Sequence, residues 1–150
     1  MLTIRFRLLW MKKGTALRRG FKSDAACSLF QEYMERISHF TPAQGEGGPP
    51  ELKPRSLVWL CDRQAGSRAL SSEDLAGRLD AVLQSGAAEL QVVIGRADGF
   101  TAEERRAWKP DVVWSFGPMT LPHELAAVVA AEQLYRAWSI LKNHPYHQGH

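Results

Sequence analysis

The stretch SLVWLCDRQAGSRALSSEDLAGRLDAVLQSGAAELQVVIG, residues 56–95, decides the fold class of this chain. It begins and nearly ends with short apolar runs, Ser56–Leu60 and Leu90–Ile94, which have the length and composition of buried strands. The segment between them predicts a helix that is capped by Ser71 or Ser72. The apolar stripe of this helix consists of Leu75, Leu79, Val82 and Leu83. Strand, helix and strand in this order predict a unit of a parallel sheet.

The alternation of strands and helices continues on both sides of this stretch. Further strands are expected over residues 2–10 and 112–116. Further helices are expected over residues 24–39, from the Thr101–Glu104 capping box onward, and from Pro122 to about Lys142. Residues 41–54 contain four of the eight prolines and predict a loop. The 150 residues are therefore expected to form one α/β domain, a mainly parallel sheet with flanking helices.

The composition argues against several classes of protein. Hydrophobic residues make up 45% of the chain, which favours a globular protein over a disordered one. No apolar run approaches the roughly 18 residues of a membrane-spanning helix. Only two cysteines occur, Cys27 and Cys61, so neither a disulfide scaffold nor a cysteine-built zinc site is expected. Cys61 follows a strand and is better interpreted as a small buried residue than as a nucleophile. A reduced, cytoplasmic setting is the default.

The positive charge is concentrated at one end of the chain. The formal net charge is only +3, but residues 1–23 contain seven basic residues and no acidic one. Such a block is typical of a surface that binds a polyanion such as nucleic acid, and also of a solvated basic edge. Apolar residues alternate with polar ones in its first part, at Leu2, Ile4, Phe6 and Leu8. This period predicts a strand rather than the amphipathic helix of a transit peptide.

The last predicted helix is apolar around most of its circumference. This pattern indicates burial in the centre of the fold or in an oligomer interface. Glu132 and Arg136 interrupt it, four residues apart on one side, at the spacing of an ion pair. The pair is either a stabilising contact at the edge of an interface or an arginine oriented toward a phosphate or carboxylate.

Three segments could carry chemistry. Ile94–Gly99 places glycines after a buried strand, where ligands of parallel sheets bind, and where an ordinary turn would look the same. Trp114–His123 passes from a strand through a turn into a helix start, whose free N–H groups suit an anion. His144–His150 contains three histidines, but its proline, its glycine and its lack of a carboxylate disfavour a metal site. Tyr146 and His147 are better suited to a nucleobase.

Several strings of residues together resemble one family. The most specific are Met119–His123 (MTLPH), Glu132–Ala137 (EQLYRA) and Pro145–His147 (PYH). Further support comes from Tyr33–Ile37, Gly66, Leu70–Glu73, Ile94–Gly95 and Asp98–Gly99. On these residues the chain resembles the ribosomal RNA large-subunit methyltransferase H family of the SPOUT class, whose members are knotted α/β methyltransferases.

The resemblance implies an enzyme that transfers a methyl group from S-adenosyl-L-methionine to N3 of a pseudouridine in 23S ribosomal RNA of the large subunit. It implies a cytoplasmic homodimer that acts on the assembled ribosome without metal or membrane. It also implies a C-terminal trefoil knot, which the usual rules of chain connection make rare. Three loops after buried strands would hold the cofactor. Carried over by position, they give Leu60, Gly95, Phe116, Gly117, Pro118, Met119, Thr120 and Leu121.

The resemblance also implies which residues act in catalysis. Tyr146 or His147 would handle the base, whose N3 proton must leave, and Arg136 would bind a phosphate or stabilise the anion. Because the cofactor already carries an activated methyl group, positioning the reactants is the main task of the protein.

The chain departs from the family pattern at four places. Arg96 stands for a glycine beside the cofactor loop, Ala126 for an arginine, and Phe116-Gly117 for a leucine-serine pair. Residues 41–54 stand for a strand and a helix, so a sheet with one strand fewer is expected. Two further functions remain open: a non-catalytic homodimer that binds RNA or the ribosome through the basic block, and a methyltransferase of the same fold with another RNA substrate.

Overall fold

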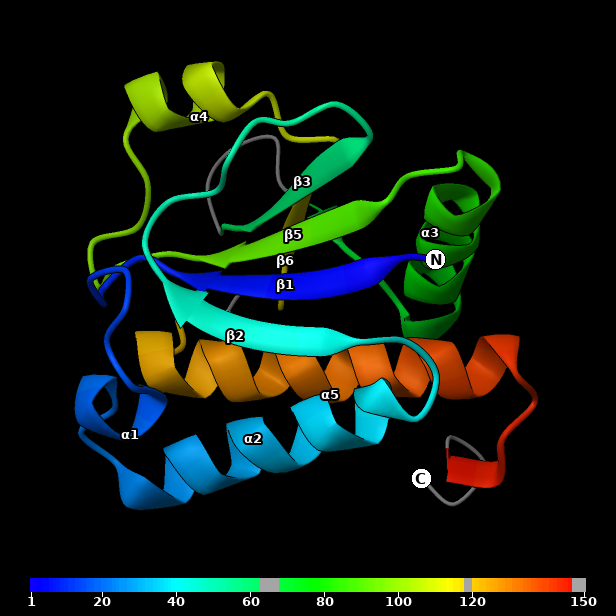
Figure 1. Cartoon of the computed structure of the whole chain (residues 1–150), viewed down its shortest axis with the longest axis horizontal. Helices are drawn as coiled ribbons and strands as arrows, with labels where there is room; N and C mark the ends of the chain where they lie inside the picture. Colours follow the sequence, from blue (N-terminus) through cyan, green and yellow to red (C-terminus); the bar gives the residue numbers. More distant parts are fainter. Residues whose placement is uncertain (63–67, 118–119, 147–150) are drawn as a thin grey trace.

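The computed structural model describes residues 1–62, 68–117 and 120–146. Its centre is a sheet of six described strands in the order β2-β1-β5-β3-β6-β4, and every pairing between them is parallel (Figure 1). The strands are β1 Thr3–Leu8, β2 Ala43–Gly47, β3 Ser56–Cys61, β4 Arg68–Ala69, β5 Glu89–Ile94 and β6 Val112–Ser115. The predicted α/β class with a parallel sheet is therefore confirmed.

Helices cover both sides of the sheet. They are α1 Leu17–Gly20, α2 Asp24–Ser38, α3 Ser72–Gln84, α4 Ala102–Trp108 and α5 His123–Leu141. Helices α2 and α5 lie side by side along one face, and α4 lies on the opposite side (Figure 1). Helix α3 packs against α5 and contributes its apolar stripe to the same core. Ser71 caps α3 and Thr101 caps α4, each in a capping box, as the sequence predicts.

The alternation of side chains along the strands divides the core between the two faces of the sheet. Ile4 and Phe6 of β1 and Trp59 of β3 point into the large core that α2, α3 and α5 cover. The opposite face of β3 and β5 carries a smaller apolar cluster, built on Val58, Leu60, Val93 and Phe100, with Trp108 of α4 packed against it. Strand β5 is buried along its whole length because both faces are covered.

Strand β2 corrects the prediction that residues 41–54 form a loop and that the sheet lacks a strand. Ala43–Gly47 pairs with β1 at the edge of the sheet. Glycine permits this close packing: a Cβ added at Gly45 would lie 2.8 Å from Cε2 of Phe30, and one added at Gly47 would lie 2.5 Å from the carbonyl oxygen of Lys12. The rest of the stretch contains no helix, in line with its prolines. The sequence analysis also missed β4 and the single-turn helix α1.

The basic block does not form one continuous surface. Arg5 and Arg7 lie on β1, and their side chains turn onto the polar half of the sheet rather than into solvent. Arg5 pairs with Glu46 and Glu89, while Arg7, only 1% exposed, donates to Gln91 and pairs with Glu46. These two charges are therefore neutralised inside the fold.

Two expectations about the architecture stay predictions. The path of a trefoil knot depends on residues 63–67 and 118–119, which lie outside the described residues. The homodimer requires a second copy of the chain. Among the described helices, none is both long enough and apolar enough to span a membrane.

Candidate functional site

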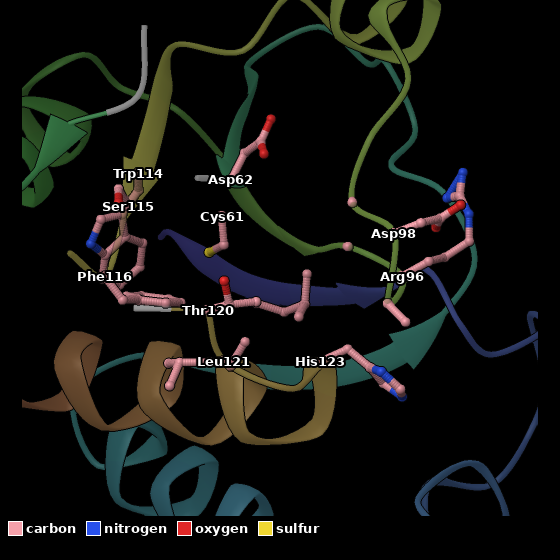
Figure 2. A pocket seen from close by; sticks show the side chains of 15 residues that line it. Cys61, Asp62, Arg96, Asp98, Trp114, Ser115, Phe116, Thr120, Leu121 and His123 are labelled. Carbon is pink, nitrogen blue, oxygen red and sulfur yellow. The ribbon is translucent and has the colours of Figure 1, made fainter. Parts of the chain in front are cut away.

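A cavity of about 350 Å³ opens at the carboxyl ends of three neighbouring strands, β3, β5 and β6 (Figure 2). This edge of a parallel sheet is the usual ligand site of α/β proteins. Three loops and the start of α5 form the cavity. The residues that line it are Cys61, Asp62, Ile94, Gly95, Arg96, Ala97, Asp98, Gly99, Trp114, Ser115, Phe116, Thr120, Leu121, His123 and Ala126.

The loop after β5 is a tight turn. The backbone N–H of Gly99 donates to the carbonyl of Arg96 over 2.9 Å, and Gly99 has a φ of 83°, which favours glycine. A Cβ added at Gly95 would lie 3.1 Å from Cε2 of Phe100, so a larger residue would press on the cluster beneath α4. The two glycines therefore hold the turn close to the sheet and leave room above it.

Arg96 does not fill the cavity, although it stands where the family has a glycine. Its guanidinium forms an ion pair with Glu104 of α4, and its side chain extends away from Phe116 and Leu121 (Figure 2). The same carboxylate accepts the backbone N–H of Thr101 in the capping box. Glu104 thus fixes both the start of α4 and the position of Arg96 at the rim.

Cys61 is the last residue of β3 and Asp62 follows it, and both line the cavity. Asp62 accepts a hydrogen bond of 2.8 Å from Nε of Arg105, which ties the strand to α4. Burial, reinforced by the negative charge of Asp62, raises the pKa of the Cys61 thiol well above its ordinary value. The thiol therefore stays protonated at neutral pH, in agreement with a structural role rather than a nucleophilic one.

Alkylation tests this assignment of Cys61. Iodoacetamide at pH 8 is expected to modify Cys61 and Cys27 more than about tenfold more slowly in the folded protein than in urea, since little thiolate forms. Burial also raises the pKa of Cys27, which is 1% exposed. Mass spectrometry of quenched samples measures both rates. Modification of Cys61 at the rate of the unfolded chain would contradict a protonated, protected thiol.

The loop after β6 supplies an aromatic wall. Trp114 and Phe116 meet edge to face with their ring centroids 4.9 Å apart. The hydroxyl of Ser115 accepts the N–H of Gly117 over 3.1 Å, and Gly117 adopts a φ of 103°, so glycine is required where the chain leaves the strand. Thr120 and Leu121 face the cavity opposite Cys61 (Figure 2).

The predicted cofactor residues divide into three groups. Gly95, Phe116, Thr120 and Leu121 line the cavity. Gly117 belongs to the same loop without being a lining residue, and Leu60 is fully buried in the cluster beneath α4. Pro118 and Met119 lie outside the described residues.

Other lining residues were not predicted as cofactor ligands, chiefly Asp62, Arg96, Ser115 and His123. Their common feature is a position just after, or at the end of, a buried strand, or at the start of the last helix. The rule that ligands bind at these strand ends already singles out the segments that contain Arg96, Ser115 and His123, and applied to β3 it would also have found Asp62.

The predicted catalytic residues form a separate cluster at the far end of α5. Glu132 accepts hydrogen bonds from Arg136, over 2.6 Å, and from the hydroxyl of Tyr146, over 2.9 Å. The guanidinium carbon of Arg136 lies 5.2 Å from the centre of the Tyr146 ring. The predicted Glu132–Arg136 ion pair is thus confirmed, and the structure adds Tyr146 to it. His147 lies outside the described residues.

Burial, together with hydrogen bonds to Tyr33 and Glu132, raises the pKa of Tyr146 above that of a free phenol. Its hydroxyl therefore stays protonated at neutral pH. In this state Tyr146 donates a hydrogen bond and does not act as a base.

This cluster and the cavity are far apart within one chain. His123 lines the cavity, and Arg136 lies thirteen residues further along the same helix, which is about 20 Å at 1.5 Å per residue. An arginine side chain cannot cover that distance. The part of the chain that the structure describes contains no cluster of His, Cys, Asp or Glu suited to a metal ion.

Comparisons with known proteins identify the family of the chain. A family model described as "Predicted SPOUT methyltransferase" matches residues 43–147. The chain is similar to proteins named ribosomal RNA large subunit methyltransferase H. The relative from Koribacter versatilis (strain Ellin345) is 37% identical over 158 residues, which cover 98% of this chain and 100% of the relative.

Two further relatives with that name are similar over most of their length. The protein of Thioalkalivibrio sulfidiphilus (strain HL-EbGR7) is 44% identical, over 92% of this chain and 78% of the relative. The protein of Stenotrophomonas maltophilia (strain R551-3) is 37% identical, over 79% of this chain and 87% of the relative. The chain therefore belongs to the ribosomal RNA large subunit methyltransferase H family of SPOUT methyltransferases.

Proposed function

We propose that this protein is a cytoplasmic methyltransferase that uses S-adenosyl-L-methionine to methylate N3 of a pseudouridine in 23S ribosomal RNA. The observation that carries the proposal is the cavity at the ends of β3, β5 and β6, formed by loops that the family resemblance assigns to the cofactor. The names of the relatives supply the RNA substrate. The nucleotide and the position of methylation come from the family resemblance alone.

The residues present in the cavity fit the cofactor. Its volume of about 350 Å³ lies within the range of small-molecule sites, about 300–1,000 Å³. Trp114, Phe116 and Leu121 offer an apolar surface for a purine, while Asp62 and Thr120 offer polar groups for hydroxyl and amino groups. When bound, S-adenosyl-L-methionine supplies an activated methyl group on its sulfonium. The protein itself has to hold the two reactants in line.

The distance between the cavity and Arg136 supports a homodimer in which the catalytic cluster of one protomer completes the cavity of its partner. A stripe of α5 is only partly buried in the single chain and is suited to such an interface: it contains Leu125, Val129, Gln133, Arg136 and Ile140. Leu125 is 44% exposed, as is Leu29 of α2. A second copy would cover these residues and bring the C-terminal cluster to the substrate.

In this site Arg136 binds a phosphate or stabilises the negative charge that the pseudouridine ring acquires when its N3 proton leaves. Tyr146 is protonated and donates its hydroxyl proton to Glu132, so its hydroxyl oxygen can accept a hydrogen bond from the same ring or from its sugar. His147 then accepts the N3 proton, because an imidazole titrates near neutral pH. Glu132 orients Arg136 and Tyr146 together.

The alternative of a non-catalytic RNA-binding dimer depended on Arg96 and Ala126. The ion pair of Arg96 with Glu104 leaves the cavity open, and Ala126 lines the cavity with a small side chain. Neither substitution argues against cofactor binding.

Calorimetric titration with S-adenosyl-L-methionine, followed by methyl transfer to ribosomes that lack the modification, tests the proposal. The protein is expected to bind the cofactor and to transfer its methyl group. An Ala126→Trp variant, which fills the cavity, is expected to bind at least about 100-fold more weakly. Arg78→Ala, on the exposed side of α3, is the matched control. If a folded protein binds no cofactor, alone or with ribosomes, the proposal is wrong.

A further inference from the structure

The basic residues of the N-terminal block other than Arg5 and Arg7 lie in residues 9–23, a segment that we call the basic arch. Its conformation is fixed by contacts with the core and between its two ends. Met11 and Phe21, each 5% exposed, anchor it in the core. The indole N–H of Trp10 donates to the carbonyl of Gly20 over 2.9 Å and so joins its two ends. A Cβ at Gly20 would lie 2.3 Å from the sulfur of Met11, so the packing is close. The conformation of the arch is therefore set before any partner binds.

The charged side chains of the basic arch point outward. Lys12, Lys13, Arg18, Arg19 and Lys22 are all exposed. Lys13 forms an ion pair with Glu51, and Arg18 donates to the hydroxyl of Ser28. Within residues 1–62, 68–117 and 120–146, the other cations form no ion pair. Since only Lys13 of these five cations is paired with a carboxylate in the part of the chain that the structure describes, the surface carries a net positive charge.

The basic arch is attached to the rim of the cavity. The ring of Trp10 lies 4.6 Å, centroid to centroid, from the imidazole of His123, which lines the cavity. The carboxylate of Glu124, only 8% exposed, accepts the backbone N–H groups of Lys22 and Ser23 over 2.8 and 3.0 Å. Figure 1 shows α1, the centre of the arch, beside the first turn of α5. The cations and the cavity are thus held in a constant relation.

We propose that the basic arch binds the phosphate backbone of the ribosomal RNA next to the nucleotide that enters the cavity. The inference rests on the proposed function and adds to it the surface that holds the substrate. Phosphate contacts fix the register of a nucleic acid without reading its sequence, so they would hold the substrate nucleotide in place beside the cavity. A surface that is ordered beforehand also loses little conformational entropy on binding.

Charge reversal on the arch tests this proposal. The variants are Arg19→Glu alone and Arg18→Glu/Arg19→Glu/Lys22→Glu together. Arg78→Glu on α3 is the matched control, because Arg78 is also an exposed helix arginine with no ion pair among the described residues. The measurements are the Kd for ribosomes that lack the modification, at several salt concentrations, and the Kd for S-adenosyl-L-methionine.

Arg19→Glu is expected to weaken ribosome binding about tenfold, and the triple variant about 100-fold or more, with the slope of log Kd against log salt smaller by about one per lost contact. Cofactor binding and thermal unfolding are expected to stay as in the wild type. Ribosome binding by Arg19→Glu equal to that of Arg78→Glu would overturn the inference. If the triple variant does not fold, Arg18→Ala, Arg19→Ala and Lys22→Ala give the same comparison singly. If the wild-type protein itself binds no cofactor or transfers no methyl group, the proposed function is wrong, and this result is distinct from a failure of the basic-arch proposal.

Discussion

Replacing Arg136 with alanine is expected to lower kcat for methyl transfer by about 100-fold or more, because a charged donor aimed at developing negative charge contributes on this scale. The Kd for S-adenosyl-L-methionine is expected to change by less than about twofold, since the proposal assigns Arg136 to the RNA nucleotide and assigns the cofactor to the loops of the cavity. Single-turnover methyl transfer to ribosomes that lack the modification and calorimetric titration measure the two quantities. Arg78→Ala is the control for removal of an exposed arginine.

Mixing two inactive variants shows which protomer supplies Arg136. Arg136→Ala keeps its cavity and lacks the catalytic cluster, whereas Ala126→Trp keeps the cluster and lacks the cavity. If each site combines both protomers, one of the two sites in a mixed dimer is intact. Random mixing then gives about a quarter of the wild-type activity, since about half of the dimers are mixed. No recovery, in a sample in which two affinity tags prove that mixed dimers are present, would show that each site is built from one chain.

A Glu132→Gln variant tests the catalytic role of the Arg136 cluster in a second way. Its carboxylate holds both Arg136 and Tyr146, so Glu132→Gln keeps the shape of the side chain and weakens both hydrogen bonds. A merely structural ion pair at this position would affect unfolding and leave kcat unchanged. An effect on kcat without an effect on unfolding therefore identifies Glu132 as a positioning residue.

The part of the fold that the sequence predicts best is the part where local signals and packing agree. The strands β3 and β5 are short apolar runs, and α3 and α4 begin at capping boxes. These signals involve residues that are close in the sequence, so the positions of the four elements can be predicted without the fold. The carboxyl ends of these strands also locate the cavity. Strand β2 could not be predicted in this way, because its glycines are poor strand formers and are explained only by the close approach of Phe30 and Lys12.

The location of the cavity relative to the catalytic cluster is also not evident from the sequence motifs alone. The strings that resemble the family place Arg136, Tyr146 and the cofactor loops in one chain. The predicted helix from Pro122 to about Lys142 already implies that Arg136 lies far from the helix start, but only the structure shows that the cavity opens at that start. The basic block gives a similar lesson. A count of charges treats Arg5 and Arg7 like Arg18 and Arg19, whereas the structure pairs Arg5 and Arg7 with carboxylates from residues 46–89 and buries Arg7. Only the second pair is available to an RNA.

The burial of Arg7 leads to the largest expected effect on stability. Its side chain donates to Gln91 over 2.9 Å and pairs with Glu46 at 2.5 Å and Glu51 at 3.7 Å. Arg7→Ala removes the cation and leaves a void between three polar groups, of which Gln91 is fully buried. The free energy of unfolding is expected to fall by about 3 kcal/mol, the scale of a broken buried ion pair. Urea unfolding at a constant protein concentration measures it.

Two companion variants separate charge from volume. Arg7→Met fills most of the void without a charge and is expected to cost about 1 kcal/mol or less, because Glu46 and Glu51 are partly exposed and stay hydrated. Arg19→Ala removes an exposed cation and is expected to change stability by less than about 0.5 kcal/mol. If Arg7→Ala were as stable as Arg19→Ala, the buried network would contribute nothing to the fold.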